Sequence, residues 1–538
     1  MRRTHFVWIV PWIAIGLSAC STLRPQYPDR YPDQHLDPAK ACAEWRWIGI
    51  SQPGGRCPKI PGWTVRPLFP QLAPVQLSAD YCEKPDSEKV PRPELIQVIQ
   101  ELNRFCVYEI ADRKKGLKDL PFPPAASSEL VRLDQDCAAL GTSAELDPAE
   151  NPWTPVSQDF LAQAGKPEVP LRVGDGPPRV RLAFLDTQPT HEGIPERSGR
   201  SPHGFVLAHI ARKLVCTPES DDHCAAQITT QLALPILAFD AKNPDHNVID
   251  RERGGYLGMQ SDLAEAIRNE VDSWWRDRQR GGSQRHLVLN LSLAWDGRLF
   301  GGLDEAQAAE MRAGTQAVYQ ALQYAAKFDV LVLAAAGNQK REPCENFGPL
   351  LPAAWESEPP QEESCRPSQK GPLLYAVGGL QANNQPLGNS RPGGMPRRAA
   401  YGESILYTGS SVATAVASAI AAAVWDSYPD YDSHRVMNIL DGSGEEVASL
   451  TANFGFGTGS PPTSTPPGVH RLLLCDAFKE ACMRSGSVSC PRCDPLDLRV
   501  VDHSKPRDVS PPLKGSCDPW VRPQPEESPR PNCAGCPP

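Results

Sequence analysis

The stretch TGSSVATAVASAIAAAVW, residues 408–425, joins a polar start to a long apolar continuation. A glycine and two serines stand directly before residues that are nearly all small and apolar. A helix that is apolar all round is buried inside a protein. The sequence therefore predicts a helix that runs through the core and begins at a polar site formed by Ser410 and Ser411.

Short apolar runs on both sides of this stretch predict the rest of the core. They are RVRLAFLDT (179–187), QLALPILAF (231–239), HLVLNLSLA (286–294), VLVLAAAGN (330–338) and LLYAVGGL (373–380). Such runs are typical of strands buried on both faces. Helical patterns lie between them at 261–278, with Ser261 expected as the N-cap, and at 315–328. This alternation predicts an α/β fold, a doubly wound, mostly parallel sheet with helices on both faces.

Composition separates this core from its flanks. The chain has 538 residues and 57 prolines, which concentrate outside a core domain expected at 178–485. Residues 41–165 form a cysteine-containing N-terminal region with one helical pattern, at 91–115, and residues 486–538 form a Pro/Cys-rich tail. The net charge of −9 argues against nucleic acid as a partner.

The N-terminus carries an export signal. Two arginines precede a short apolar run, which is typical of a signal peptide over 1–19 and too short to cross a bilayer. The sequence LSAC, ending at Cys20, resembles the bacterial lipobox, in which the cysteine is acylated; ordinary signal peptidase cleavage is the alternative. A lipid anchor at Cys20, a Pro-rich tether over 20–40 and attachment to the outer membrane of the cell envelope are therefore expected. Ser21, at the sorting position, favours that membrane.

Export makes disulfides the expected state of the cysteines. There are 17, and setting Cys20 aside leaves an even number. Cys216 with Cys224 and Cys344 with Cys365 are expected local pairs. Cys475 and Cys482 are too far apart along a helix to bond to each other. The CPRC (490–493) and CAGC (533–536) motifs leave a zinc site as an alternative to disulfides.

Polar residues stand where the predicted strands and helices end or begin. Asp186 ends the first strand, Ser292 lies near the end of the third, and Asn338 ends the fourth. His203 and Ser411 each open a helix. In a parallel sheet, side chains at the C-terminal strand ends share one edge. An acid, a histidine, an amide and a serine gathered there indicate nucleophilic acyl transfer.

At this point the chain resembles the subtilisin-like serine proteases, the subtilase family, over about 178–485. The similar motifs, in order, are LAFLDT, HGFVLA, VLNLSLA, LVLAAAGN, TGSSVATAVA and the closing GVHRLLLCDAFKEAC. The order Asp, His, Ser is that family's order. The resemblance implies a serine endopeptidase that acts on proteins or peptides.

The resemblance also implies a role for each residue. Ser411 aligns with the nucleophile, His203 with the general base and Asp186 with the residue that orients it. Asn338 and the Ser411 N–H would bind the oxyanion. Two further sets follow. Ser292, Leu293 and Ala294 would pair with the substrate backbone, and Ala335, Ala336 and Gly337 would line the pocket for the residue before the scissile bond.

Departures from the family pattern leave a second hypothesis open. Gln188 stands where the family has glycine, and Val412 and Ala415 replace the methionine and proline of the serine motif. The alternative is a catalytically degenerate subtilase-fold lipoprotein that acts as a surface binding module. No cofactor is expected, and structural calcium, common in the family, cannot be assigned to residues.

Overall fold

The computed structural model describes the chain in segments. These are residues 42–69, 93–110, 129–141, 144–145, 156–167, 176–187, 203–217, 220–233, 249–250, 255–295, 311–338, 349–357, 361–362, 370–391, 395–404, 407–451 and 468–486. All of them fall in one compact unit, Leu36–Pro538. The predicted signal peptide, Cys20, the predicted tether and the tail after 486 lie outside the described residues. In the described part, no helix is long and apolar enough to cross a membrane.

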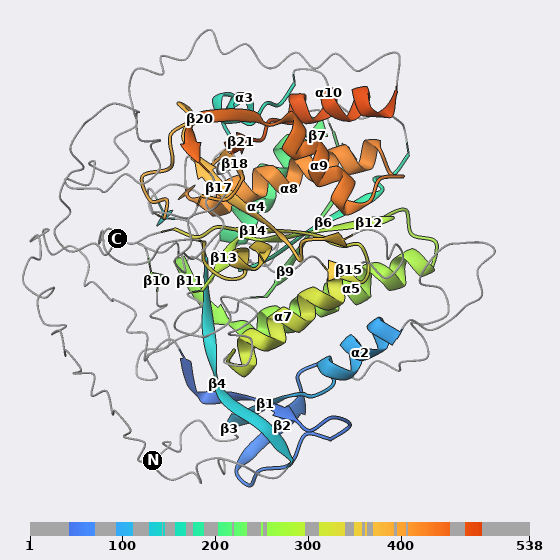
Figure 1. The fold of residues 1–538 in the computed structure, drawn as a ribbon, viewed down its shortest axis with the longest axis vertical. Coiled ribbons are helices and arrows are strands. Elements are labelled where there is room, and N and C mark those ends of the chain that lie inside the picture. Colours follow the sequence, from blue (N-terminus) through green and yellow to red (C-terminus); the bar gives the residue numbers. More distant parts are fainter. Residues whose placement is uncertain are drawn as a thin grey trace, which may run out of the picture. The chain divides into compact units, whose positions relative to one another are not determined.

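An eight-stranded sheet forms the centre of the C-terminal region, residues 156–486 (Figure 1). Its order is β20-β21-β18-β17-β14-β12-β6-β9, and every pair is parallel except β20 with β21. The strands are β6 (Val180–Asp186), β9 (Gln227–Leu232), β12 (His286–Leu291), β14 (Leu331–Ala335), β17 (Tyr375–Leu380), β18 (Arg398–Tyr401), β20 (Glu445–Thr451) and β21 (Gly468–Arg471). The predicted mostly parallel α/β sheet is confirmed.

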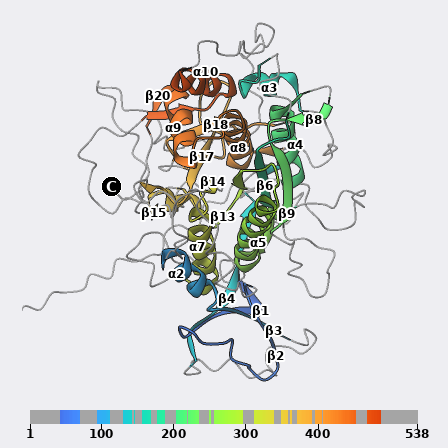
Figure 2. The ribbon, with the colours of Figure 1, turned by 90° about the vertical axis from the view of Figure 1, so that its right-hand side faces the viewer.

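Helices cover both faces of this sheet (Figure 2). One face carries α5 (Gln260–Gln279) and α7 (Ala313–Ala326), and the other carries α4 (His203–Val215), α8 (Ser410–Ser427), α9 (Ser433–Ser443) and α10 (Leu474–Ser485). Two separate apolar clusters result. One contains the α5 and α7 side chains, and the other contains those of α4 and α8. The sheet is buried on both sides, as its continuous apolar strands predict.

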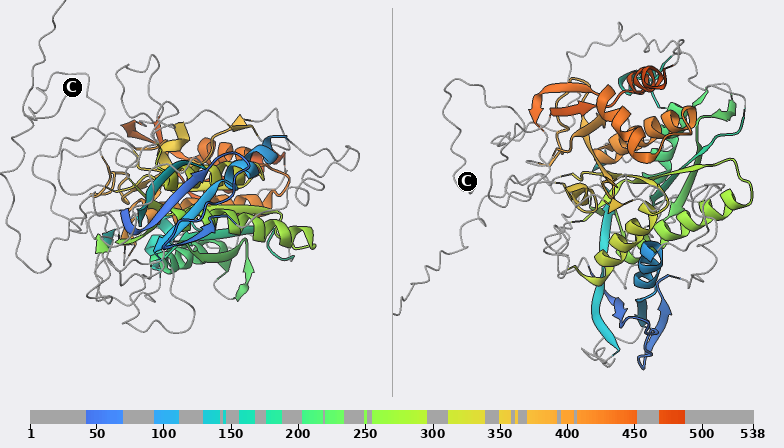
Figure 3. Two further views of the ribbon diagram at one scale, coloured as in Figure 1. Left: turned by 90° about the horizontal axis from the view of Figure 1, so that it is seen from below. Right: turned by 45° about the vertical axis from the view of Figure 1, so that its right-hand side comes forward.

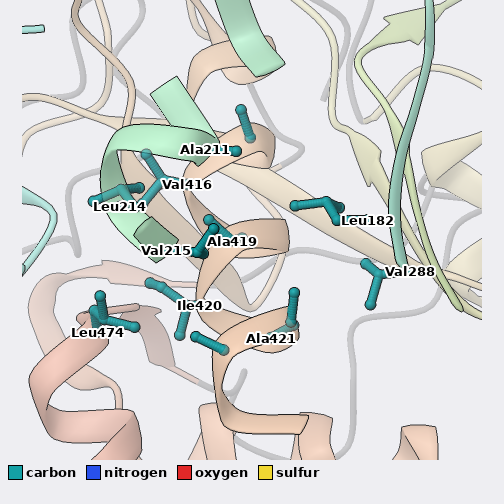
Figure 4. Packing of buried hydrophobic residues seen from close by; sticks show 14 of the residues in the cluster. Leu182, Ala211, Leu214, Val215, Val288, Val416, Ala419, Ile420, Ala421 and Leu474 are labelled. Carbon is teal, nitrogen blue, oxygen red and sulfur yellow. The ribbon is translucent and has the colours of Figure 1, made fainter. Parts of the chain in front are cut away.

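Helix α8 is the predicted central helix, and it is buried from Ser410 to Asp426. Its small side chains bring it close to its neighbours on several sides (Figure 4). Leu182 of β6 and Val288 of β12 lie on one side, and Leu214 of α4 and Leu474 of α10 lie on others. A close-packed interior of this kind fixes the position of the helix, and therefore of the serines at its start.

Residues 42–141, here called the N-terminal region, form an antiparallel sheet that the sequence analysis did not predict (Figure 3). Its strands are β1 (Cys42–Ser51), β2 (Trp63–Pro67), β3 (Phe105–Ile110) and β4 (Leu130–Gly141), with one helix, α2 (Pro93–Leu102). The predicted helix over 91–115 is therefore wrong between Asn103 and Ile110, and residues 111–115 lie outside the described residues. The sequence FCVYEI at 105–110 is rich in aromatic and β-branched residues and pairs between β1 and β2 as a strand.

Two further expectations need correction. The predicted strand 231–239 is β9 at Gln227–Leu232, so it begins earlier, in QITTQL. This strand is at the edge of the sheet and half-exposed, which tolerates polar residues that a central strand would not.

Ser261 is not the N-cap of α5, because Met259 holds that position and makes no side-chain cap. Ser261 instead donates its hydroxyl to Asp136 of β4.

Several short elements complete the structure. They are β5 (Ala144–Glu145), α3 (Gln158–Gln163), β7 (Cys216–Thr217), β8 (Ser220–Cys224), β10 (Ile249–Asp250), β11 (Gly255–Met259), β13 (Leu293–Ala294), η4 (Ala353–Ser357), β15 (Gln361–Glu362), β16 (Lys370–Gly371) and β19 (Tyr407–Thr408). Phe160 and Leu161 of α3 pack in the cluster around α8.

Disulfides hold both regions. Those that join two described cysteines are Cys42–Cys137, Cys57–Cys106 and Cys216–Cys224. The last is an expected pair. Cys475 and Cys482 are also disulfide-bonded, and the bonds between described cysteines do not join them to each other. Cys344, Cys365 and the two predicted alternative zinc motifs lie outside the described residues.

Candidate active site

Asp186 and His203 form a buried pair at the C-terminal edge of the sheet. Asp186 is the last residue of β6, and His203 is the first of α4. The imidazole Nδ1 lies 3.0 Å from each carboxylate oxygen of Asp186. Asp186 Oδ1 also accepts from the Thr187 N–H at 2.5 Å and the Thr187 hydroxyl at 3.0 Å. Because a carboxylate only accepts, Nδ1 carries the proton, and Nε2 is the basic nitrogen of the neutral ring.

Gly204 allows α4 to begin this close to β6. Its N–H donates to the Thr187 carbonyl at 2.9 Å. A Cβ on Gly204 would clash with that carbonyl oxygen and would lie 2.7 Å from the Asp186 Cβ. A side chain at this position would push His203 away from its carboxylate partner.

Ser411 is tied to the end of β12 by a buried polar network. Its hydroxyl donates to the Ser292 carbonyl at 3.2 Å. The Ser292 hydroxyl lies 3.1 Å from the Ser411 carbonyl and 2.7 Å from Asn290 Oδ1. Asn290 in turn donates to the Ser418 hydroxyl at 3.0 Å. The network fastens the first two turns of α8 to the sheet.

Asn338 lies beside the start of α8 and is oriented by Ser410. Its Oδ1 accepts from the Ser410 N–H at 3.1 Å and lies 3.2 Å from the Ser410 hydroxyl oxygen. A backbone N–H can only donate, so the amide oxygen faces Ser410 and the amide NH₂ is directed away from it. The Ser410 hydroxyl accepts from the Gly337 N–H at 3.0 Å. Ser410 thus positions the Asn338 amide.

The predicted pocket residues Ala335, Ala336 and Gly337 lie together at the end of β14. Ala336 donates to the Val377 carbonyl at 2.9 Å and accepts from the Leu350 N–H at 2.8 Å. Gly337 has φ of +92°, and a Cβ there would lie 2.7 Å from the Leu350 side chain. Only glycine suits this position. Leu350 closes one side of this stretch.

The predicted substrate-pairing residues carry an antiparallel partner from the same chain. Leu293 pairs with Gly141 and Ala294 with Leu140, so β13 meets the end of β4. The opposite edge of β4 pairs with β11. The backbone edge that we expect to bind substrate therefore accepts an extended peptide, and β4 occupies it in this structure (Figure 1).

His203 and the serine segment approach each other through Tyr407 of β19. The His203 and Tyr407 rings are 5.3 Å apart, edge to face. Tyr407 lies just before Ser411 in sequence, and β19 leads into α8. The full chain buries the whole group, with His203 2% exposed, Asn338 1% and Ser411 0%. These three candidate residues are therefore buried in this structure.

Sequence reasoning missed the residues that support the site. Asn290 is a single amide within a buried apolar strand, and Ser418 is a second polar residue on α8, two turns after Ser411. A buried polar residue needs a partner, so each was a detectable signal. Nothing in the sequence indicated that Tyr407 would face His203. Gln188 and Cys20 lie outside the described residues.

The described residues show no metal centre beside this site. Among them, no group of three or more His, Cys, Asp or Glu side chains is placed to hold an ion. No step of the chemistry below is assigned to a metal.

Comparisons with known proteins agree with the motifs. Residues 257–459 match the model of the subtilase family, and this range includes Asn338 and Ser411. No curated protein matches the sequence.

Solved structures similar to this chain include three proteases. The patellamide maturation protease PatA is 21% identical, over 58% of this chain and 99% of its own, with a TM-score of 0.33. The prenylagaramide maturation protease PagA is 18% identical, over 57% and 95%, with a TM-score of 0.33. The MycP3 protease of the type VII (ESX-3) secretion system is 16% identical, over 63% and 92%, with a TM-score of 0.35. The family match therefore assigns residues 257–459 of this chain to the subtilase family, the serine protease family that its motifs resemble.

Proposed function

We propose that this chain is a serine endopeptidase that hydrolyses peptide bonds with Ser411 as nucleophile. The observation that carries the proposal is the Asp186–His203 pair, with Nδ1 3.0 Å from both carboxylate oxygens, at the sheet edge where α8 begins. That arrangement leaves Nε2 as a base, and Tyr407 links it to the serine segment. A binding module would need none of this proton chemistry.

The chemistry follows from the atoms present. His203 Nε2 takes the Ser411 proton as Oγ attacks the substrate carbonyl, and it returns that proton to the leaving amine. Asp186 keeps the ring in the required tautomer and stabilises the imidazolium. Charge that develops on the carbonyl oxygen meets the Asn338 amide and the N–H groups at the start of α8, where a helix favours an anion.

The substrate would bind as an extended strand on β13. Leu293 and Ala294 pair with backbone rather than side chains, which suits many peptide sequences. Ala335, Ala336 and Gly337 would receive the side chain before the scissile bond.

We place the enzyme in the bacterial cell envelope, held at the outer membrane by a lipid on Cys20. The support is the LSAC motif behind a short apolar run. Cys20→Ala should move the protein from the membrane fraction to the soluble periplasm, and unchanged membrane association would exclude the anchor.

The enzymatic assignment is tested with Ser411→Ala, His203→Ala and the double variant. Residues that act as one unit lose activity non-additively, so all three should reach a similar floor, several orders of magnitude below wild type. Ser485→Ala, at the exposed end of α10, is the matched control and should keep full activity. Peptide cleavage by Ser411→Ala at the wild-type rate would exclude the assignment.

A further inference from the structure

Leu350 and Leu351 lie between the two predicted sides of the pocket for the residue before the scissile bond. The Leu350 N–H donates to the carbonyl of Ala336, which belongs to one side, at 2.8 Å. Leu351 pairs with Trp295, which directly follows β13 on the other side, through hydrogen bonds of 2.8 and 2.9 Å. The two leucines therefore connect both sides of the pocket.

This connection lies at the end of the pocket that is farther from the nucleophile. On the β13 side, the Ser292 carbonyl accepts from the Ser411 hydroxyl, and Trp295 comes three residues later. An extended chain rises about 3.3 Å per residue, so Trp295 lies roughly 10 Å farther along. On the other side, Asn338 contacts the start of α8, and Ala336 comes two residues before it. The leucines therefore form the floor of the predicted pocket.

The Leu350 side chain reaches from this floor to Gly337. A Cβ added to Gly337 would lie 2.7 Å from Leu350 Cδ1, 2.8 Å from Cγ and 3.1 Å from Cβ. The leucine thus packs along its whole length against the glycine. Gly337 is next to Asn338, whose amide would bind the oxyanion. Little depth is therefore left in the pocket for the side chain of a substrate.

The surroundings of Leu350 distinguish it from a core residue. Its side chain is buried, at 7% exposed, yet among the described residues it belongs to none of the apolar clusters that form the core. Its neighbour Leu351 is 0% exposed and belongs to the cluster that contains α5 and α7. Leu351 thus anchors this segment in the core, and Leu350 faces the pocket.

The backbone of Leu350 is fixed, so its side chain cannot easily move aside. Its N–H is bonded to Ala336, and its carbonyl accepts from the Ala354 N–H of η4 at 2.9 Å. The next residue of η4, Trp355, is fully buried, and its ring meets the rings of Trp295 and Tyr319 edge to face. Close packing of this kind resists displacement, and a larger group forced against it would strain the structure.

We propose that Leu350 determines the specificity of this enzyme by filling the pocket, so that Ser411 cleaves after small residues, alanine and glycine above all. This inference rests on the proposed endopeptidase function. A methyl group fits beside the leucine against Ala335 and Gly337. A leucine, phenylalanine or lysine side chain of a substrate would overlap the Leu350 side chain.

The overlap should reduce catalysis as well as binding. A peptide that pairs with β13 has a fixed backbone position. A side chain too large for the pocket would displace that backbone and hold the scissile carbonyl away from Ser411 Oγ and the Asn338 amide. The loss should therefore appear in kcat/KM, where one methylene group in an apolar pocket changes the value by about 10- to 200-fold.

The specificity is tested on the full chain with a peptide library, in which mass spectrometry identifies each bond that is cut. The residue before the cut should be alanine, glycine or serine in nearly all products. For two peptides that differ only at this residue, kcat/KM should be at least about 100-fold higher with alanine than with phenylalanine. Cleavage mainly after bulky residues would overturn this inference and leave the proposed function standing. A protein that cuts no member of the library would overturn the proposed function.

The role of Leu350 is tested with Leu350→Ala, which removes the atoms beyond Cβ that lie against Gly337. The kcat/KM of the phenylalanine peptide, relative to that of the alanine peptide, should rise by about 10- to 100-fold. This ratio does not depend on the fraction of enzyme that is folded, so it remains decisive if the variant is less stable. Leu440→Ala removes the same atoms from the core on α9 and should keep the wild-type ratio.

A second variant covers the case in which Leu350→Ala does not fold. Leu350→Met keeps nearly the same volume, but its unbranched side chain can bend away from a substrate. The ratio of the two kcat/KM values should therefore shift in the same direction by a smaller factor. A wild-type ratio in both variants of Leu350 would show that another residue limits the pocket, and would overturn this inference.

Discussion

The two regions of this protein are stabilised in different ways. The C-terminal region is a parallel sheet buried by helices on both faces, with an apolar helix through one cluster. The N-terminal region is a smaller antiparallel sheet with two disulfides, and charged groups sit at its boundary with α5 and α7. Apolar side chains also cross this boundary, because Leu95 and Ile99 of α2 belong to the same cluster as Val318 of α7. The N-terminal region therefore depends partly on packing against the C-terminal region.

Asp186→Asn should give the largest effect, because it acts on the fixed geometry of the C-terminal region. An amide keeps the shape but favours the wrong imidazole tautomer, so kcat should fall by roughly 10⁴-fold. Asp476→Asn, on the exposed side of α10, is the control and should change nothing. Peptide hydrolysis measures both. A wild-type kcat in Asp186→Asn would show that this carboxylate has no role in the mechanism.

Removal of a disulfide should give the next largest effect, and it should act on one region and not the other. Cys42–Cys137 closes 95 residues and Cys216–Cys224 closes 8. Replacing both cysteines of the first pair with serine, in the Ser411→Ala chain, should cost about 4 kcal/mol, or roughly 10³-fold faster exchange of β1 amides. Residues in β6 should keep their protection. The same replacement of Cys216 and Cys224 is the control and should spare β1. Equal loss of protection in β1 and β6 would show that the two regions open as one.

The difference between the parallel sheet and the antiparallel sheet also explains how much of the fold could be predicted from the sequence. In the C-terminal region, continuous apolar runs end at Asp186 and Asn338, so local pattern predicts both the sheet and the edge where polar residues gather. In the N-terminal region, β1, β3 and β4 depend on pairing between distant segments. For example, Gly49 lies opposite both Cys106 and Leu133. No local period encodes such pairing, and the helix expected at 91–115 was therefore extended through β3.

The candidate active site could likewise be predicted from the sequence only in part. Each candidate residue stands at a strand or helix end that its own segment indicates. The covering of the site depends on where β4 and β5 pair, and only the tertiary structure shows that. The Ser261 N-cap failed for a related reason, since the carboxylate at that helix start comes from Asp136, far away in sequence.

Asn338→Ala should have a smaller effect than Asp186→Asn. Its amide meets charge only in the transition state, so kcat should fall about 10²- to 10³-fold with KM nearly unchanged. The variant also removes the acceptor for the Ser410 N–H, so a melting curve should accompany the kinetics. A rise in KM with constant kcat would instead assign Asn338 to substrate binding.

A change of pH should have the smallest effect, and it should act on the contacts between the N-terminal and C-terminal regions. The group responsible is Asp136. Burial raises its pKa from 3.8 to about 7, and the charge of Asp262 adds to this. Arg46, 3.8 Å away, and the bonds from Ser261 act in the opposite direction. Gly314 of α7 lies beside this carboxylate, since a Cβ there would be 3.2 Å from Asp136 Oδ1. Because the pKa is higher in the folded state, the stability tied to protonated Asp136 is complete below about pH 4 and is lost as the pH rises to about 7.

The contacts that hold the N-terminal region should therefore weaken as the pH rises, by at most about tenfold per pH unit and roughly 50-fold between pH 5 and 7. Amide exchange of β1 in the Ser411→Ala chain, corrected for the intrinsic effect of pH, measures it. Asp136→Asn stays neutral, keeps an acceptor for Ser261, and should lose most of the pH dependence. Burial also raises the pKa of Asp262, so a weaker dependence in the same direction should remain. Asp476→Asn should keep the full dependence. If Asp136→Asn keeps the pH dependence of the parent chain, Asp136 is not responsible for it. Other groups would then hold the two regions together, chiefly the apolar packing of α2 on α7.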